Sequence, residues 1–206
     1  PDGVRDLRHR ATEYGHGPTM HSFPDLVRPL HSETVTLRFE SERDIPEVLI
    51  AHQDDPTLHA RLGLPRPPSG AELGRRIERA RDERASGHGA RFTILEPGSD
   101  VCRGQLDVHR VDWDDLRAEA GIWVAPGFRG RGLGSAALRL AAAWLFDVCG
   151  LERLELLTEP DNAAMIAAAK AAGLVQEGVL RAYVTERDRR VDLTILSLLP
   201  ADLEDR

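Results

Sequence analysis

A glycine-rich stretch, residues 129–135, is the part of this chain whose composition and spacing point most directly to chemistry. It joins an apolar, strand-like run at 120–124 to an alanine- and leucine-rich, helix-like run at 135–149. A turn between a strand and a helix N-terminus aims several backbone N–H groups at one anion, and glycines let a phosphate approach those amides closely. The sequence therefore predicts a pyrophosphate-binding loop formed by Arg129, Gly130, Arg131, Gly132, Leu133, Gly134 and Ser135.

Two common phosphate-binding motifs do not fit this loop. The dinucleotide fingerprint spaces its glycines G-x-G-x-x-G, whereas Gly130, Gly132 and Gly134 are spaced G-x-G-x-G. The Walker A motif places a lysine after its glycines, and the one lysine of the chain is the distant Lys170. Both mismatches disfavour an unrelated nucleotide-binding protein, which is the weakest interpretation of this loop.

What remains resembles the R/Q-x-x-G-x-G/A signature of the GNAT superfamily of acyl-CoA-dependent N-acyltransferases, here Arg129-x-x-Gly132-x-Gly134. A second motif, after a further strand and helix, resembles the ending of the RimJ/RimL-type branch of that family. It consists of Asn162, Lys170, Gly173, Leu174 in a position that usually holds Phe, Glu177, Gly178 and Arg181. The resemblance covers residues 34–199. It implies an α/β (α+β) fold, a GNAT-like single domain with a mixed, mostly antiparallel central sheet, a splayed strand pair and flanking helices.

The resemblance also implies how acetyl-CoA would be held as co-substrate. In GNAT proteins the strand before the loop splays from its neighbour and opens a slot for the pantetheine arm. The backbone of residues 122–124 would pair with that arm, so we expect Trp123 and Val124 to line the slot. The Val124 N–H would polarise the thioester carbonyl, and Asn162 would contact the arm from the opposite wall.

Each of these side chains also has a purely structural interpretation. Arg129 and Arg131 could be exposed charges beside a turn. Asn162 could be a helix N-cap, alone or in addition to a binding role. Trp123 could belong to the core or to a pocket wall.

Acetylation of an amine also needs a group that removes a proton from the nitrogen. Glu119 is the first candidate, because several GNAT members carry near this strand position a carboxylate that acts through water. His109 could act instead if its face of the neighbouring strand lines the cleft. Tyr183 is a third candidate, as an acid or a substrate contact. Family members carry a proton-donating Tyr or Ser where this chain has Ala169 and Met165, neither of which can donate a proton.

The composition of the whole chain bounds its function further. The 206 residues are 41% hydrophobic and 30% charged, with a formal net charge of −7, which is typical of a soluble globular protein and argues against a general nucleic-acid binder. No apolar run approaches the ~20 residues that span a bilayer, and no signal peptide is recognisable. We expect a cytoplasmic protein without a membrane partner or metal site, in which Cys102 and Cys149 pack as small apolar side chains.

The chain is expected to form one main domain. Residues 1–22 show no periodicity and are interpreted as a flexible N-terminal arm or as a segment added to the native chain, and residues 23–206 as a single acyltransferase domain. Strands are expected at 34–39, 91–96, 101–111, 117–124 and 154–158, helices at about 41–52, 69–85, 135–149 and 162–172, and a final hairpin up to residue 199.

Two further features are expected between the first strands. Ser41 with Asp44 and Ser69 with Glu72 resemble capping boxes that open two helices. A proline-rich loop at 54–68 separates these helices. The second helix carries Arg75, Arg76, Arg79 and Glu83, which are expected on a solvated face.

The leading interpretation is an acetyl-CoA-dependent N-acetyltransferase that moves an acetyl group to a primary amine by direct attack in a ternary complex. The amine is either a protein N-terminal amine or a small-molecule amine, aminoglycoside-like compounds included. The alternative is a non-catalytic acyl-CoA-binding or regulatory module on the same fold, which the missing Tyr and Ser favour. A homodimer formed through the terminal hairpin would be compatible with the family resemblance.

Overall fold

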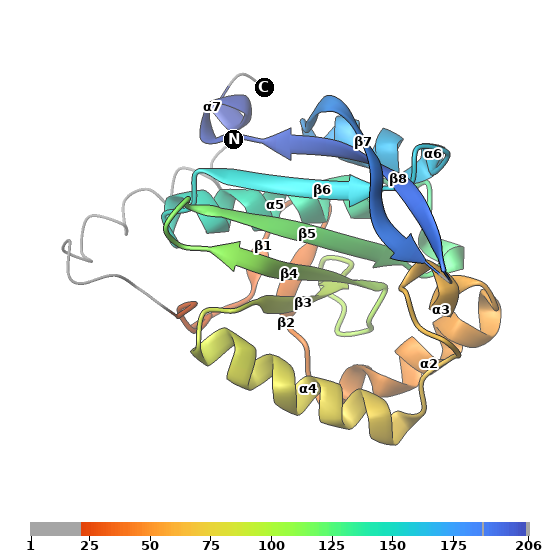
Figure 1. The fold of residues 1–206 in the computed structure, drawn as a ribbon. Coiled ribbons are helices and arrows are strands. Elements are labelled where there is room, and N and C mark those ends of the chain that lie inside the picture. Colours follow the sequence, from red (N-terminus) through yellow and green to blue (C-terminus); the bar gives the residue numbers. More distant parts are fainter. Residues whose placement is uncertain (1–21, 187, 205–206) are drawn as a thin grey trace.

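The computed structural model describes residues 22–186 and 188–204, and the predicted N-terminal arm lies outside them apart from Ser22. The described chain forms an eight-stranded sheet in the order β1-β2-β3-β4-β5-β6-β8-β7 (Figure 1). Neighbouring strands are antiparallel except β5 and β6, which run parallel. The predicted mixed, mostly antiparallel sheet is thereby confirmed. The strands are β1 (Leu30–His31), β2 (Thr36–Phe39), β3 (Ala90–Leu95), β4 (Gly104–Asp112), β5 (Arg117–Val124), β6 (Arg153–Thr158), β7 (Val175–Glu186) and β8 (Arg189–Leu198).

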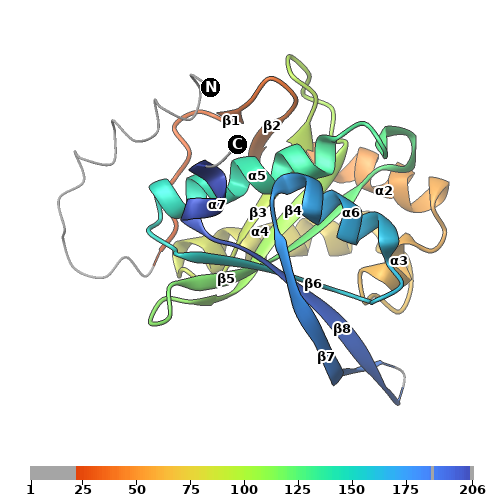
Figure 2. The same ribbon diagram turned by 90° about the horizontal axis from the view of Figure 1, so that it is seen from above.

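Helices cover both faces of the sheet. One face carries the long helix α5, flanked by α6 and α7, and the other carries α2 and α4 (Figures 1 and 2). The hairpin of β7 and β8 projects from the sheet on the side opposite α5 (Figure 2). The helices are η1 (Glu42–Asp44), α2 (Ile45–Asp54), α3 (Leu58–Arg61), α4 (Gly70–Ala85), η2 (Pro126–Phe128), α5 (Leu133–Asp147), α6 (Ala163–Ala172) and α7 (Pro200–Glu204).

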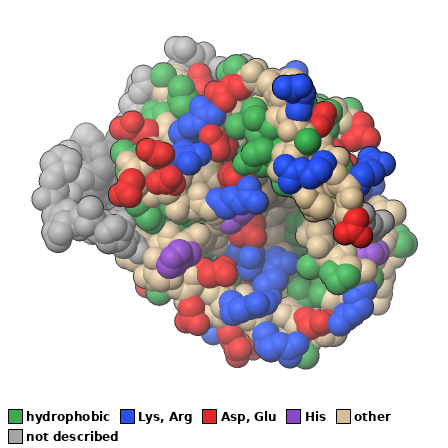
Figure 3. Space-filling view, viewed as in Figure 1, with side chains coloured by type: hydrophobic (Ala, Val, Ile, Leu, Met, Phe, Trp, Pro, Cys, Tyr) green, Lys and Arg blue, Asp and Glu red, His purple; other side chains and the backbone are tan. Residues whose placement is uncertain are grey.

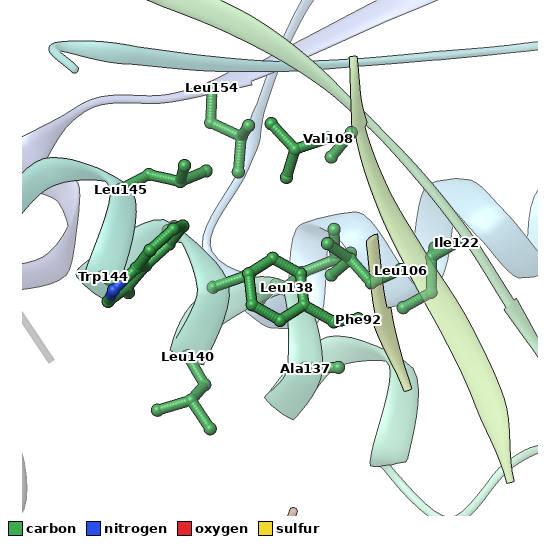
Figure 4. Packing of buried hydrophobic residues seen from close by; sticks show 14 of the residues in the cluster. Phe92, Leu106, Val108, Ile122, Ala137, Leu138, Leu140, Trp144, Leu145 and Leu154 are labelled. Atoms are coloured by element: carbon green, nitrogen blue, oxygen red, sulfur yellow. The ribbon is translucent and has the colours of Figure 1, made fainter. Parts of the chain in front are cut away.

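The main core lies between α5 and the sheet. Helix α5 is rich in alanine, so its backbone approaches the strands closely, and its larger side chains fill the gap. Trp144 is buried against Phe92 with a ring-centroid distance of 5.4 Å in an edge-on arrangement. Figure 4 shows Leu138 and Leu145 beside this pair, facing the side chains of the strands. This packing fixes α5 against the sheet.

Most predicted elements are present, and two local predictions are corrected. At α4 the Glu72 N–H donates to Ser69 Oγ at 3.3 Å and the Ser69 N–H donates to Glu72 at 2.8 Å, so that capping box is confirmed. The loop expected at 54–68 contains the short helix α3, because a single helical turn leaves too weak a periodic pattern to recognise.

The second correction concerns the helix face that was expected to be solvated. Arg75 and Arg79 are exposed, but Arg76 folds against the sheet, where it donates to the Gln105 side-chain oxygen at 2.8 Å. It also lies 3.9 Å from the buried carboxylate of Glu40. A long arginine can bury its aliphatic stem and still pair its guanidinium, which the amphipathic pattern of α4 does not reveal.

The expectation for the two cysteines can also be compared with the structure. Both cysteines are buried as predicted, and burial raises the pKa of Cys102 to about 12, so its thiol stays protonated. In the described part of the chain, no helix has the length and apolar character that a bilayer crossing would require. The described residues also contain no cluster of His, Cys, Asp and Glu that could bind a metal ion.

Candidate active site

The parallel strands β5 and β6 part in the middle of the sheet. Their pairing runs only from Arg117 with Arg153 to Glu119 with Glu155. Beyond that point β5 continues to Val124 along β4, while β6 continues to Thr158 along β8. The two strands therefore diverge, and the predicted splayed pair is confirmed. Among the described residues, none forms a strand beside the backbone of β5 on the opened side beyond Glu119.

The ladder geometry shows which backbone groups face the opening. The Ala125 N–H donates to the Arg103 carbonyl at 2.8 Å, next to the facing pair of Gly104 and Val124. In an antiparallel ladder this makes Gly104 and Val124 a non-hydrogen-bonded pair, whose N–H and C=O groups point away from each other. The Val124 N–H is thus directed toward β6, into the space between the diverging strands.

The glycine-rich loop delivers a set of free amides beside this opening. Gly130 and Gly132 have φ values of 74° and 80°, a left-handed conformation that glycine adopts without strain. Gly132 is the N-cap of α5, and the first intrahelical donor there is the Ala136 N–H, at 3.0 Å from the Gly132 carbonyl. The amides of Leu133, Gly134 and Ser135 therefore lack intrahelical acceptors and point out of the helix end, as an anion site requires.

The third glycine of the loop sets the distance between helix and strand. A Cβ at Gly134 would lie 3.6 Å from Val124 Cγ2 and 3.8 Å from Ile122 Cδ1, which is ordinary contact distance. The position therefore accepts glycine or alanine and little more. Leu133 anchors the same turn by burying its side chain in the core, so it can offer a ligand only its backbone.

The two loop arginines are placed differently. Arg129 donates from Nε to the Val124 carbonyl at 2.9 Å and from a terminal nitrogen to the Asp55 carboxylate at 2.7 Å. Arg131 is exposed and lies over the Phe128 ring, 5.0 Å from its centroid. The structure therefore leaves Arg131 available to an anion at the loop, whereas the Arg129 guanidinium is engaged by the end of β5.

Asn162 and Trp123 adopt the structural positions that the sequence had left open. The Asn162 side chain caps α6 by accepting from the Met165 N–H at 3.2 Å, and it donates to Thr158 Oγ1 at 3.0 Å. Trp123 is buried in a small cluster with residues of α2, α3 and α4. It thus ties the end of β5 to the helices on the face opposite α5.

The three candidate catalytic residues gather on that same face. Glu119 of β5 lies across from His109 of β4, with 3.7 Å between the Glu119 carboxylate and His109 Nε2. Glu119 and Tyr183 both line a cavity of about 580 Å³, together with Arg110. Figure 3 shows this side of the molecule hollowed near its centre, where acidic, basic and histidine side chains meet. Tyr183 reaches the cavity from the projecting hairpin.

Arg110 is a residue of this site that the sequence did not suggest. It donates to both carboxylate oxygens of Glu119, at 3.0 and 3.2 Å, and the hydrogen bonds from Arg110 to Glu119 raise the pKa of the guanidinium. Arg110 has a φ of 49°, at the bulge where the β4–β5 register shifts. Only the pairing of the two strands creates this bulge, so a linear pattern contains no signal for it.

Asp55 is the second missed residue. It lies in the segment expected to be a loop at 54–68, yet its side chain is only 10% exposed and binds Arg129. The spacing of Asp55 and Thr57 did contain a local signal, because an aspartate often accepts from the N–H two residues ahead. The Thr57 N–H donates to Asp55 at 3.1 Å in the structure.

Comparison with known proteins agrees with this geometry. The family model described as an acetyltransferase (GNAT) domain matches residues 34–175. The chain is 26% identical over 173 residues to p20 of Bacillus licheniformis, an uncharacterised N-acetyltransferase, covering 84% of this chain and 97% of p20. It is 28% identical over 178 residues to YdaF of Bacillus subtilis strain 168, provisionally named a ribosomal N-acetyltransferase, covering 84% and 95% of the two chains.

A solved structure extends the similarity to the fold. RimJ of Mycobacterium smegmatis, in complex with CoA-disulfide, superposes with a TM-score of 0.72 at 24% sequence identity. The match covers 87% of this chain and 90% of RimJ. At this level of identity the match shows a common fold, and a member of that fold binds a CoA species.

Proposed function

This chain belongs to the GNAT acetyltransferase family and is an N-acetyltransferase, and we propose that it carries the acetyl group of acetyl-CoA to a primary amine by direct attack in a ternary complex. One observation supports this mechanism above the others. The opened seam between β5 and β6 lies beside the free amides at the start of α5, because Gly134 of that helix packs next to Val124 of β5. Acetyl-CoA in an extended conformation would match this arrangement, with its thioester in the seam and its pyrophosphate at the amides.

The residues of the chain would divide the binding of acetyl-CoA between them. The amides of residues 130–135, with Arg131, would hold the pyrophosphate. The Val124 N–H would donate to the thioester carbonyl oxygen and stabilise the negative charge that develops there during attack. Asn162 would contact the pantetheine arm from its position at the start of α6, while continuing to cap that helix.

The chemistry needs a proton acceptor for the amine. The amine nitrogen attacks the thioester carbon, one N–H proton leaves, the C–S bond breaks, and the thiolate takes a proton to give the thiol of CoA. We propose Glu119 as the base, acting directly or through water, with His109 next to it as the alternative and Tyr183 as a proton donor or amine contact. Ala169 and Met165 cannot protonate the thiolate, so its proton would come from water or from Tyr183.

The cavity beside Glu119 is suited to a cationic amine. Its lining carries four carboxylates, Asp112, Asp114, Glu119 and Glu155, and two guanidinium groups, Arg110 and Arg117. This excess of negative charge attracts an ammonium group before it is deprotonated. The name of YdaF favours a protein N-terminal amine, whereas the modest size of the cavity also admits a small-molecule amine. An amine library that includes N-terminal peptides of ribosomal proteins separates the two classes.

Calorimetric titration with acetyl-CoA, CoA and NAD tests the proposed co-substrate. We expect the two CoA species to bind with micromolar dissociation constants, about −8 kcal/mol of binding free energy, and NAD not to bind. Thiol release in the presence of the amine library then tests the transfer. If acetyl-CoA binds but no amine in the library causes release of the CoA thiol, the non-catalytic acyl-CoA-binding module would be favoured.

Replacing Glu119 by glutamine should lower kcat about 10²- to 10⁴-fold, because the amide cannot accept the proton. The dissociation constant of CoA should stay within threefold of the parent value. Steady-state kinetics with a reactive amine and calorimetry with CoA measure the two effects. Asp115→Asn is the matched control, since Asp115 lies in the turn just before the same strand but outside the cavity lining. Equal rates for both variants would exclude Glu119 as the base.

A further inference from the structure

The Arg129 guanidinium is hydrogen-bonded to two groups of the protein itself. Its Nε donates to the Val124 carbonyl at 2.9 Å, and a terminal nitrogen donates to Asp55 at 2.7 Å. One guanidinium thus bridges Val124, the last residue of β5, and Asp55, the C-cap residue of α2. These elements belong to different parts of the site. Strand β5 borders the opened seam, and α2 covers the face of the sheet opposite α5.

Asp55 is itself rigidly placed. Its backbone N–H donates to the Ala51 carbonyl at the end of α2, and its second carboxylate oxygen accepts from Thr57 Oγ1 at 2.7 Å. The hydrogen bonds from Thr57 and from Arg129 lower the pKa of Asp55 to about 2. The carboxylate is therefore ionised at any working pH and serves as a fixed anion for Arg129.

The contact with Val124 completes the fixation of one peptide unit. The peptide that joins Val124 to Ala125 is held on one side by Arg129, through the carbonyl, and on the other by the Arg103 carbonyl, which accepts the Ala125 N–H at 2.8 Å. This peptide is held at the C-terminal side of Val124, and the pairing of Trp123 with Gln105 of β4 holds the N-terminal side, so both sides restrict rotation of the Val124 backbone. Its N–H is consequently aimed in one direction, into the seam.

We propose that Arg129 is a positioning residue for the Val124 N–H, with Asp55 as its anchor, rather than a ligand of the pyrophosphate. This inference rests on the proposed function, in which the Val124 N–H polarises the thioester carbonyl. A donor that is 1 Å out of place can lower the rate about 100-fold, so the fixed peptide serves the transition state. The bridge also makes the thioester-polarising group depend on the position of α2 and α3, which cover the face that carries Glu119.

The test compares two arginines that approach the same carboxylate. Arg129→Gln removes the bridge, whereas the control Arg61→Gln removes an exposed guanidinium 3.7 Å from Asp55 that does not contact Val124. We expect Arg129→Gln to lower kcat 10- to 100-fold while the KM of acetyl-CoA and the dissociation constant of CoA stay within threefold. CoA has no thioester carbonyl, so its binding does not report on the Val124 N–H. Arg61→Gln should match the parent.

Two further measurements separate positioning from phosphate binding. In the ligand-free protein, hydrogen exchange of the Ala125 amide, followed by NMR, should become at least tenfold faster in Arg129→Gln than in Arg61→Gln. Arg129→Lys keeps the charge but not the two-point geometry, so it should resemble Arg129→Gln in kcat.

The outcomes are distinct. A dissociation constant of CoA raised tenfold or more in Arg129→Gln and restored in Arg129→Lys, with unchanged amide exchange, would identify Arg129 as a phosphate ligand and overturn the inference. A parent protein that releases no thiol with any amine would overturn the proposed function. In that case the exchange of the Ala125 amide still decides whether Arg129 holds the end of β5.

Discussion

Replacing Gly132 by valine is expected to raise the dissociation constant of CoA at least 100-fold. Gly132 has a φ of 80° and is the N-cap of α5. Valine is strained in this left-handed conformation, at about 1–2 kcal/mol, and relief of the strain would turn the first amides of α5 out of register. Its branched side chain would also cover the amides that a phosphate must approach. Calorimetry with CoA measures the effect.

The fold should survive this substitution. A Cβ at Gly132 meets nothing within 4 Å, so the predicted loss of stability is only that of the backbone strain. Gly74→Val is the matched control, because Gly74 lies in α4 with equally open space and without a positive φ. We expect the control to bind CoA like the parent. If Gly132→Val also binds CoA like the parent, the start of α5 is not the pyrophosphate site.

Replacing Asp44 by alanine should destabilise the protein by about 3–5 kcal/mol, the usual effect of leaving one partner of a buried ion pair uncompensated. Asp44 is 2% exposed and accepts from two nitrogens of the buried Arg38 and from Thr93 Oγ1. Without the carboxylate, the Arg38 charge would remain in the interior beside β2 and β3. Chemical denaturation monitored by tryptophan fluorescence measures the loss.

A second aspartate near the same arginine provides the control. Asp100 lies 4.0 Å from Arg38 Nε but its side chain is 76% exposed. Water and salt screen such a pair, so Asp100→Ala should change the free energy of unfolding by about 1 kcal/mol or less. Equal destabilisation by Asp44→Ala and Asp100→Ala would contradict the role assigned to burial.

The contribution of Asp44 should also depend on pH. Burial opposes its ionisation, but hydrogen bonds from Arg38, Thr93 and the Ser41 N–H outweigh burial and lower the pKa of its carboxyl below the ordinary value of 3.8. The folded protein therefore binds this proton less readily than the unfolded chain. The stabilisation is complete above the unfolded pKa of about 3.9 and is lost as the pH falls through the lower folded pKa.

Unfolding experiments with the parent and Asp44→Asn measure this dependence. The difference in free energy of unfolding should be constant from pH 7 to about pH 5 and should narrow below about pH 4, where the unfolded carboxyl takes up its proton. A difference that stays constant down to pH 3 would show that the ionised form of Asp44 does not stabilise the fold.

The sequence was most informative where structure depends on near neighbours. The strand at 117–124 and the helix that begins at Gly70 after Ser69 have the predicted bounds, because alternation and capping act within a few residues. The helix expected at 135–149 is present with its bounds shifted by two residues, at Leu133–Asp147. Short elements such as α3 were missed, since four residues contain too little pattern.

The sequence could suggest the parts of the candidate site but not the contacts between them. Val124 and the loop amides follow from one continuous stretch of strand, turn and helix, and this motif is sufficient to locate them. The partners of Arg129 and Glu119 do not follow in this way. Asp55 is 74 residues away from Arg129 in the sequence, and Arg110 faces Glu119 only because a bulge turns it there.

The sequence by itself therefore determined the order of elements, the acyltransferase loop and the candidate residues, because local propensity, glycine conformation and motif spacing are properties of short segments. The tertiary structure alone decided that the separation of β5 and β6 begins after Glu119, that Arg76 folds against the sheet, that Asp55 is buried, and that Arg129 reaches the end of β5. These features arise when strands pair and helices pack across the sheet. A linear pattern does not specify which distant charges such packing brings into contact.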